Sequence, residues 1–289
     1  MLKKYFLFFL LIFALGCGKK APSCSAPKPL VLTSIAPYCF LAEKIGGDRI
    51  EVQTIVPPNA NPHIFEPTSS QTAQMIRGDI WLQIGEPFEE KIAPILKGRK
   101  ANLVLLDLRS QVPLLEETHS TCRHCSKDHF DRHIWLSPKL AALQAKEIER
   151  ALSEKYPVFA SEFKANLTSL LNELSQIAQN IETRLGSVQS RTILVSHPAF
   201  GYFCKDYGLE QLSVEFEGKD PRPKHLEEIL KKAVSKNIRL ALSLPQHNNK
   251  GAELIAQKLS KPIYSIDPYS PDYFEMLEKL TSLIEENHE

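Results

Sequence analysis

Short apolar runs alternate with helical patterns through the first half of this chain. The apolar runs, rich in β-branched residues, are Leu30–Ile35, Ile50–Val56, Ile80–Ile84 and Leu103–Leu106. Between them, apolar residues recur at the spacing of amphipathic helices in Tyr38–Ile45, Ser70–Arg77 and Glu89–Leu96. Nearly continuous apolar runs are typical of strands buried on both faces of a parallel sheet. The alternation therefore predicts a lobe built from βαβ units.

The second half of the chain repeats the alternation. We predict its strands at Thr192–Val195, Leu212–Glu215, Leu240–Leu244 and Ile263–Ile266. We predict its helices at Phe200–Tyr207, Lys224–Ser235, Gly251–Leu259 and from Asp272 to about Glu286. The fold class is therefore α/β, with two lobes of mainly parallel sheet.

Two long helical patterns lie between the halves, at Pro138–Lys155 and Val158–Leu185. An apolar stripe runs through the whole of the second pattern. At ~1.5 Å per residue this helix would be about 40 Å long, enough to run past both lobes. We therefore expect a stiff linking helix at 157–187, between an N-terminal lobe at 30–156 and a C-terminal lobe at 188–289.

The first residues have the pattern of an export signal. Two lysines precede an apolar stretch, Tyr5–Leu15, which is too short to span a bilayer. Cys17 follows where bacterial lipoproteins carry their lipidated cysteine, and ordinary cleavage after Gly16 is the alternative. We expect residues 1–16 to be a signal peptide and 17–29 a tether. The mature protein would then be exported, either lipid-anchored on the outer face of the cytoplasmic membrane or free in the periplasm.

Composition narrows the class of protein. The chain has 289 residues, 43% hydrophobic and 24% charged, which suits a globular protein of two domains. A net charge of +1 argues against nucleic acid as a partner. Five cysteines remain beyond Cys17, an odd number, so a disulfide framework is not expected to hold the fold.

Three histidines and one aspartate lie in short turns at matched places in the two lobes: His63, His133, His197 and Asp267. Three of them follow predicted strands, and His133 precedes a predicted helix start. Taken alone, His63, His133 and Asp267 are better explained as ordinary turn residues, and His197 at a strand end is the stronger candidate. Because loops at the carboxyl ends of parallel strands converge, we expect all four to meet in a cleft between the lobes. Such a set of nitrogens with one carboxylate suits Zn2+ or a neighbouring first-row metal.

A second group of potential ligands is concentrated in one short segment: His119, Cys122, His124, Cys125 and His129. Its Cys-x-x-Cys pair has the spacing of metal ligands, but the same pair could form a disulfide in an oxidising compartment. We expect a loop near the cleft that binds metal weakly. Elsewhere, His225 and His288 are interpreted as surface residues and His247 as a minor ligand candidate.

The chain resembles the metal-binding lipoproteins of the zinc and manganese class of ABC importers, the family that contains ZnuA and TroA. The resemblance runs from about Pro29 to the C-terminus. Its motifs are Asn61–Pro67, Arg132–Pro138, Ser196–Phe203 with Tyr207–Leu209, Glu217–Leu226 and Ile266–Pro268.

This resemblance implies two (β/α)4 lobes bridged by one long rigid helix, with the metal site between them. It implies His63, His133, His197 and Asp267 as ligands, and no catalytic activity. It also implies a monomer that delivers a divalent metal ion to a membrane permease with a cytoplasmic ATPase. The chain departs from the family at Asp131-Arg132, where a proline more often precedes the histidine, and in its short Cys/His segment.

The third ligand favours one metal over the others. It is His197 here, whereas manganese binders of the family usually have glutamate at that place. Nitrogen ligands favour zinc and carboxylates favour manganese, so we expect Zn2+, with Mn2+ or Fe2+ as alternatives.

Two other functions are less favoured. An exported zinc hydrolase would need an open coordination position and a general base. An adhesin with a structural metal would need an exposed recognition surface.

Overall fold

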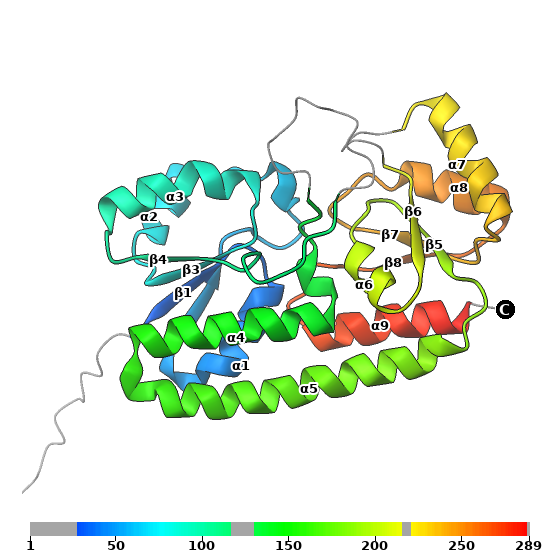
Figure 1. The fold of residues 1–289 in the computed structure, drawn as a ribbon. Coiled ribbons are helices and arrows are strands. Elements are labelled where there is room, and N and C mark those ends of the chain that lie inside the picture. The colour runs from blue at the N-terminus through cyan, green and yellow to red at the C-terminus, as the bar shows by residue number, and fades with distance from the viewer. Residues whose placement is uncertain (1–27, 117–129, 216–220, 288–289) are drawn as a thin grey trace, which may run out of the picture.

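The computed structural model describes residues 28–116, 130–215 and 221–287, in which two parallel four-stranded sheets lie side by side (Figure 1). The first sheet has the order β2-β1-β3-β4 and the second the order β6-β5-β7-β8. The first contains β1 (Leu30–Thr33), β2 (Glu51–Thr54), β3 (Ile80–Gln83) and β4 (Val104–Asp107). The second contains β5 (Thr192–Val195), β6 (Glu210–Ser213), β7 (Ala241–Ser243) and β8 (Ile263–Ser265). The prediction of two parallel α/β lobes is confirmed.

The helices cover both faces of the sheets. Those of the first half are α1 (Pro37–Gly46), α2 (Ser69–Met75), α3 (Pro87–Arg99) and α4 (Pro138–Lys155). They are followed by α5 (Ala160–Gly186), α6 (Gly201–Asp206), α7 (Pro223–Ser235), α8 (Lys250–Leu259) and α9 (Tyr273–Glu286). Short 3-10 turns are η1 (Gly47–Arg49), η2 (Pro62–Ile64), η3 (Ile134–Leu136) and η4 (Pro157–Phe159). Several helices begin with proline, whose fixed φ and missing N–H suit the first turn.

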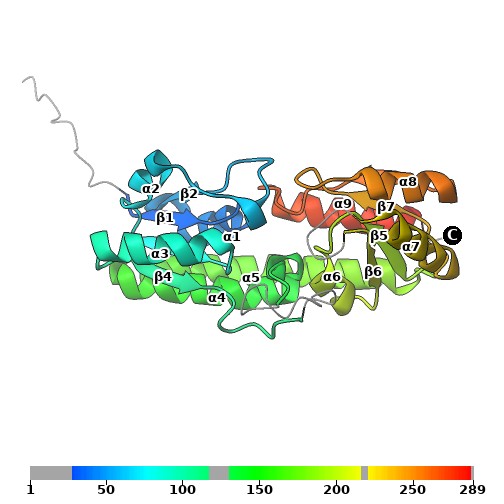
Figure 2. The ribbon, with the colours of Figure 1, turned by 90° about the horizontal axis from the view of Figure 1, so that it is seen from above.

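The long helix α5 has 27 residues and runs along both lobes (Figures 1 and 2). It packs against α1 and α4 of the first half and against α9 of the second. The sequence predicted a helix from Val158, but the structure begins it at Ala160 after the turn at η4. The bridging helix is confirmed.

One hydrophobic core joins the two lobes through this helix. The cluster contains Val31 of β1, Leu170 of α5 and Ile193 of β5. Neighbouring strand residues point to the opposite sheet faces, where Leu32 and Leu194 belong to two smaller clusters, one in each lobe. Because strand side chains alternate between faces, each sheet is buried on both sides.

The strand β6 lies two residues earlier than predicted. Glu210–Ser213 pairs with Thr192–Val195, although the sequence pattern favoured Leu212–Glu215. The prediction followed the apolar residues, whereas the ladder includes the exposed Glu210 at the sheet edge. Val214 and Glu215 still donate backbone hydrogen bonds to Val195 and Ser196, so the chain stays extended to the site.

The boundaries of the two lobes and of the linking helix stay predictions. None of the described helices is long and apolar enough to cross a membrane.

Candidate metal centre

Three of the four predicted ligands lie together. One ring nitrogen from each of His63, His133 and His197 falls within a group whose members are all within 4.8 Å of one another. The Nε2 atoms of His63 and His197 are 3.3 Å apart. The first two histidines come from the N-terminal lobe and the third from the C-terminal lobe, so the centre is shared.

His63 lies in η2, beyond the end of β2. Asn61 begins this turn, and its side-chain oxygen accepts a hydrogen bond from the His63 N–H at 2.9 Å. Pro62 is buried and fixes the backbone at the first position of the turn. The local sequence Asn-Pro-His therefore holds this imidazole in place without a regular helix or strand.

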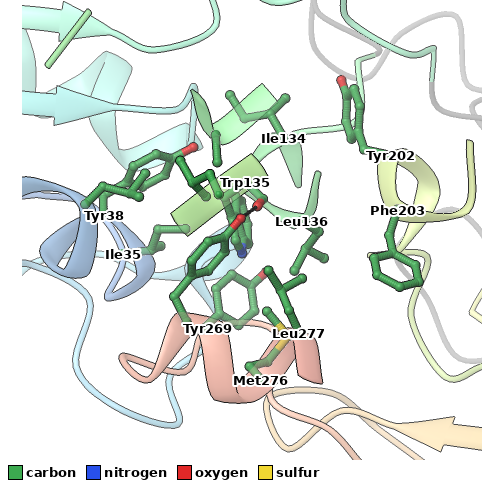
Figure 3. Packing of buried hydrophobic residues seen from close by; sticks show 14 of the residues in the cluster. Ile35, Tyr38, Ile134, Trp135, Leu136, Tyr202, Phe203, Tyr269, Met276 and Leu277 are labelled. Carbon is green, nitrogen blue, oxygen red and sulfur yellow. Dashed lines mark hydrogen bonds between the residues drawn. The ribbon is translucent and has the colours of Figure 1, made fainter. Parts of the chain in front are cut away.

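His133 precedes η3, whose residues Ile134 and Trp135 are fully buried (Figure 3). Asp131 accepts hydrogen bonds from both the backbone N–H and Nδ1 of His133, at 2.9 and 2.7 Å. The indole N–H of Trp135 donates to the Pro268 carbonyl at 2.8 Å. This bond ties the turn of His133 to the C-terminal lobe.

His197 follows β5, one of the two central strands of the second sheet. It lies where the strand order reverses, the usual position of sites in open α/β sheets. The adjacent Ser196 is buried, and its hydroxyl accepts a hydrogen bond from the Leu244 N–H at 3.2 Å. That bond fixes the strand end relative to the chain that follows β7.

A carboxylate lies behind each histidine. The Nδ1 atoms of His63 and His197 are 3.0 Å from Glu86 and 2.9 Å from Glu215, and Asp131 holds His133 as described. An ionised carboxylate only accepts hydrogen bonds, so it holds the proton of a neutral imidazole on Nδ1, and Nε2 of that neutral ring then presents its lone pair. Such carboxylate–histidine pairs orient imidazoles toward a metal ion.

The sequence reasoning missed these three carboxylates. Glu86 follows β3 directly after Gly85, whose φ of +86° makes the turn. Glu215 ended a predicted strand, and Asp131 stood in the motif around His133, where it was read as a departure from the family. An acidic residue just beyond a strand end, near a candidate histidine, was the available signal.

Burial and charge set the protonation of the histidines. Burial lowers the pKa of His133 well below its usual range and lowers the pKa of His197 to about 3. Burial also acts to lower the pKa of His63, but the charge and hydrogen bond of Glu86 outweigh it and raise that pKa. Two of the imidazoles are therefore neutral, and ready to bind a cation, across the physiological range.

Asp267, the fourth predicted ligand, lies outside this group of nitrogens. Its Oδ1 accepts hydrogen bonds from the Gln246 side chain and from the Tyr269 N–H, both at 2.9 Å. Instead, the hydroxyl of Tyr269 reaches the centre, 3.4 Å from Nε2 of His63 and 3.3 Å from Nε2 of His133. No separate sequence feature predicted Tyr269 beyond its place after Asp267-Pro268.

His247 lies beside the centre. Its ring stacks on that of His197, with centroids 3.8 Å apart, and its Nδ1 is 3.4 Å from Glu215. The shared carboxylate and the stacked ring hold His197 from two sides. The remaining candidates, namely Cys17, His119, Cys122, His124, Cys125, His129 and His288, lie outside the described residues.

Comparisons with known proteins identify a family of metal-binding proteins. A family model described as the periplasmic zinc-uptake complex component A, ZnuA, matches residues 31–287. A putative metal-binding protein of Chlamydia trachomatis is 30% identical over 273 residues, which cover 94% of this chain and 96% of that protein. The zinc-binding protein AdcA of Streptococcus pyogenes is 25% identical over 212 residues, 68% of this chain and 41% of AdcA.

The fold agrees as well. A crystal structure of ZnuA superposes with a TM-score of 0.84 at 30% identity, covering 91% of this chain and 100% of that one. This chain therefore belongs to the ZnuA family of metal-binding, solute-binding proteins of transport systems.

Proposed function

We propose that this protein is the extracytoplasmic component of an ABC importer, and that it captures Zn2+ and delivers it to a membrane permease with its cytoplasmic ATPase. The observation that carries the proposal is the convergence of the three histidine Nε2 lone pairs, each backed by a carboxylate on Nδ1. Imidazole nitrogens suit Zn2+ better than Mn2+, which prefers carboxylate and water oxygens. Mn2+ and Fe2+ are the alternative cargoes.

The same carboxylates argue for binding rather than hydrolysis. A zinc hydrolase needs a general base beside the metal-bound water. Glu86, Asp131 and Glu215 each already accept a hydrogen bond from a histidine Nδ1. Their oxygens orient the histidine ligands, and we propose that the protein has no catalytic activity. We also propose that it is a monomer.

The export pattern supports the proposed location. We propose that the mature chain is exported and anchored by lipid at Cys17 on the outer face of the cytoplasmic membrane. A lipid anchor keeps the binding protein close to its permease.

Asp267 stays a predicted ligand on the family resemblance alone.

The test is metal analysis of protein purified without added metal, followed by competitive titration with Zn2+ and Mn2+. We expect one equivalent of tightly bound zinc per chain and far weaker binding of manganese. If the protein binds manganese more tightly than zinc, manganese and not zinc is the cargo. Turnover of esters or amides by the zinc-loaded protein would contradict the assignment as a binding protein.

A further inference from the structure

Gly85 lies at the turn between β3 and α3, directly before the carboxylate that holds His63. The residue is buried, its φ is +86°, and a Cβ atom there would lie 2.1 Å from Nη1 of Arg109. Glycine is the residue that fits both this backbone conformation and this close approach. The next residue, Glu86, is fully buried, and its Oε2 lies 3.0 Å from Nδ1 of His63. The conformation of the turn therefore decides where this carboxylate lies.

Both polar groups of the Gly85 backbone are held by side chains. The N–H donates to Oε2 of Glu89 at 2.7 Å, and the carbonyl accepts a hydrogen bond from Nε of Arg132 at 2.6 Å. The carbonyl belongs to the planar peptide unit that also contains the N–H and the Cα atom of Glu86. A donor that fixes this carbonyl therefore fixes the plane from which the Glu86 side chain starts.

Arg132 comes from a different motif of the same lobe. It lies between Asp131 and His133, whose Nδ1 donates to the Asp131 carboxylate at 2.7 Å. Gly85 and Arg132 are 47 positions apart, so their hydrogen bond joins the turn before Glu86 to the loop that carries His133. This is the position where the chain departs from the family, and a proline could not donate this bond.

We propose that Arg132 is a positioning residue of the metal site. Its hydrogen bond to Gly85 fixes Glu86 behind His63 and relates this pair to His133, so the two imidazoles of the N-terminal lobe form one half-site before metal binds. Preorganised ligands bind more tightly because they lose less conformational freedom on binding. The inference rests on the proposed function, since it concerns the same metal.

A purely structural role for the bond is the alternative. A buried carbonyl needs a donor wherever it lies in a protein. If the bond did no more than satisfy that need, its loss would lower the free energy of unfolding and leave the affinity for zinc unchanged.

Two neutral substitutions isolate the hydrogen bond. Arg132→Gln keeps an N–H donor as many bonds from Cα as Nε of arginine, whereas Arg132→Met has none. Both remove the positive charge, so its repulsion of the metal ion is lost equally in both. We expect Arg132→Met to bind zinc about three- to tenfold more weakly than Arg132→Gln, less than the about 10–100-fold effect of a group that contacts a ligand directly. The same pair of substitutions at Arg150, which forms ion pairs with Glu147 and Glu154 on α4, is the control and should show no difference.

A double-mutant cycle shows whether Arg132 acts through Glu86. Glu86→Ala removes the group that Arg132 positions, and in that background we expect Arg132→Gln and Arg132→Met to differ by less than about twofold. An undiminished difference there would overturn the proposal, as would equal zinc affinities of the two variants when Glu86 is present. Melting of each metal-free variant checks that it folds, and if Glu86→Ala does not fold, the comparison with Glu86 present decides. Failure of the wild-type protein to bind zinc would instead contradict the proposed function.

Discussion

The Nε2 atoms of His63 and His197 lie 3.3 Å apart, although 134 positions separate the two residues in the chain. Each belongs to a different lobe, and each has its own carboxylate behind it, Glu86 and Glu215. The two half-sites therefore face each other across the boundary between lobes. A metal that bonds both nitrogens links the two lobes directly.

Removal of any one of the three histidines should disable the site. We expect His63→Ala, His133→Ala and His197→Ala each to weaken zinc binding by more than about 100-fold, because a direct metal bond contributes more than the 10–100-fold of an outer-sphere partner. Competition against a chromophoric chelator measures the affinity. His225→Ala, on α7, is the control and should have no effect. An equal loss in that variant would show that the ligand assignment is wrong.

The carboxylates behind the histidines should matter less, but measurably. Glu86→Gln and Glu215→Gln keep the size of the side chain and remove its charge, so the imidazole loses its fixed orientation and part of its basicity. We expect affinity for zinc to fall about 10–100-fold. The matched control is Glu66→Gln, since Glu66 is exposed and pairs with Lys91. If both site variants bind zinc with wild-type affinity, the carboxylates do not orient the histidines and contribute only to packing.

The fold could be predicted from the sequence because its signal is repeated. Eight apolar runs mark eight strands, and only β6 was displaced, by its exposed edge residue Glu210. His63 and His197 were predicted from their places beyond strands whose carboxyl ends converge, and His133 from its place before a helix start. The same argument also selected Asp267, which lies outside the group of nitrogens.

The partners of these histidines were harder to predict. Glu86 and His63 are 23 residues apart and meet only because β3 and β2 both flank β1. Tyr269 reaches the centre because the Asp267-Pro268 turn is fixed by Trp135, which is distant in sequence. Contacts of this kind depend on tertiary packing, and no local pattern encodes them.

Zinc affinity should fall as the pH drops, and His63 should set where the fall begins. Glu86 raises the pKa of His63, whereas burial lowers those of His133 and His197. Metal binds the neutral imidazole, so protons compete first at His63, at pH values above the ordinary ~6.5. Below that pKa we expect affinity to drop about tenfold per pH unit.

The Glu86→Gln variant tests this assignment. Loss of the carboxylate charge should lower the pKa of His63, so the fall in affinity should begin at a lower pH than in the wild type. Titration of both proteins with zinc between pH 5 and 8 gives the two profiles. Profiles with the same onset would mean that His63 is not the group that titrates.

The shared core should make α5 essential to stability. Leu170 is fully buried in the cluster that joins the lobes, and Leu170→Ala should lower the free energy of unfolding by about 2–5 kcal/mol. Urea unfolding followed by circular dichroism measures the change. Val158 is 80% exposed, so Val158→Ala should change stability by no more than about 0.5 kcal/mol. A small effect of Leu170→Ala would show either that the space left by the substitution collapses or that α5 does not stabilise both lobes.

Replacement of Cys17 by serine should release the protein from the membrane without changing its affinity for zinc. A lipoprotein cysteine carries a diacylglycerol, and two acyl chains suffice for stable anchoring, whereas one gives only reversible binding. The metal ligands begin at His63, beyond the predicted tether, so the anchor and the site should be independent. Fractionation of cells that express each form, followed by zinc titration of the soluble protein, measures both properties. A wild-type mature chain that begins at Cys17, carries no lipid and stays in the soluble fraction would exclude the anchor.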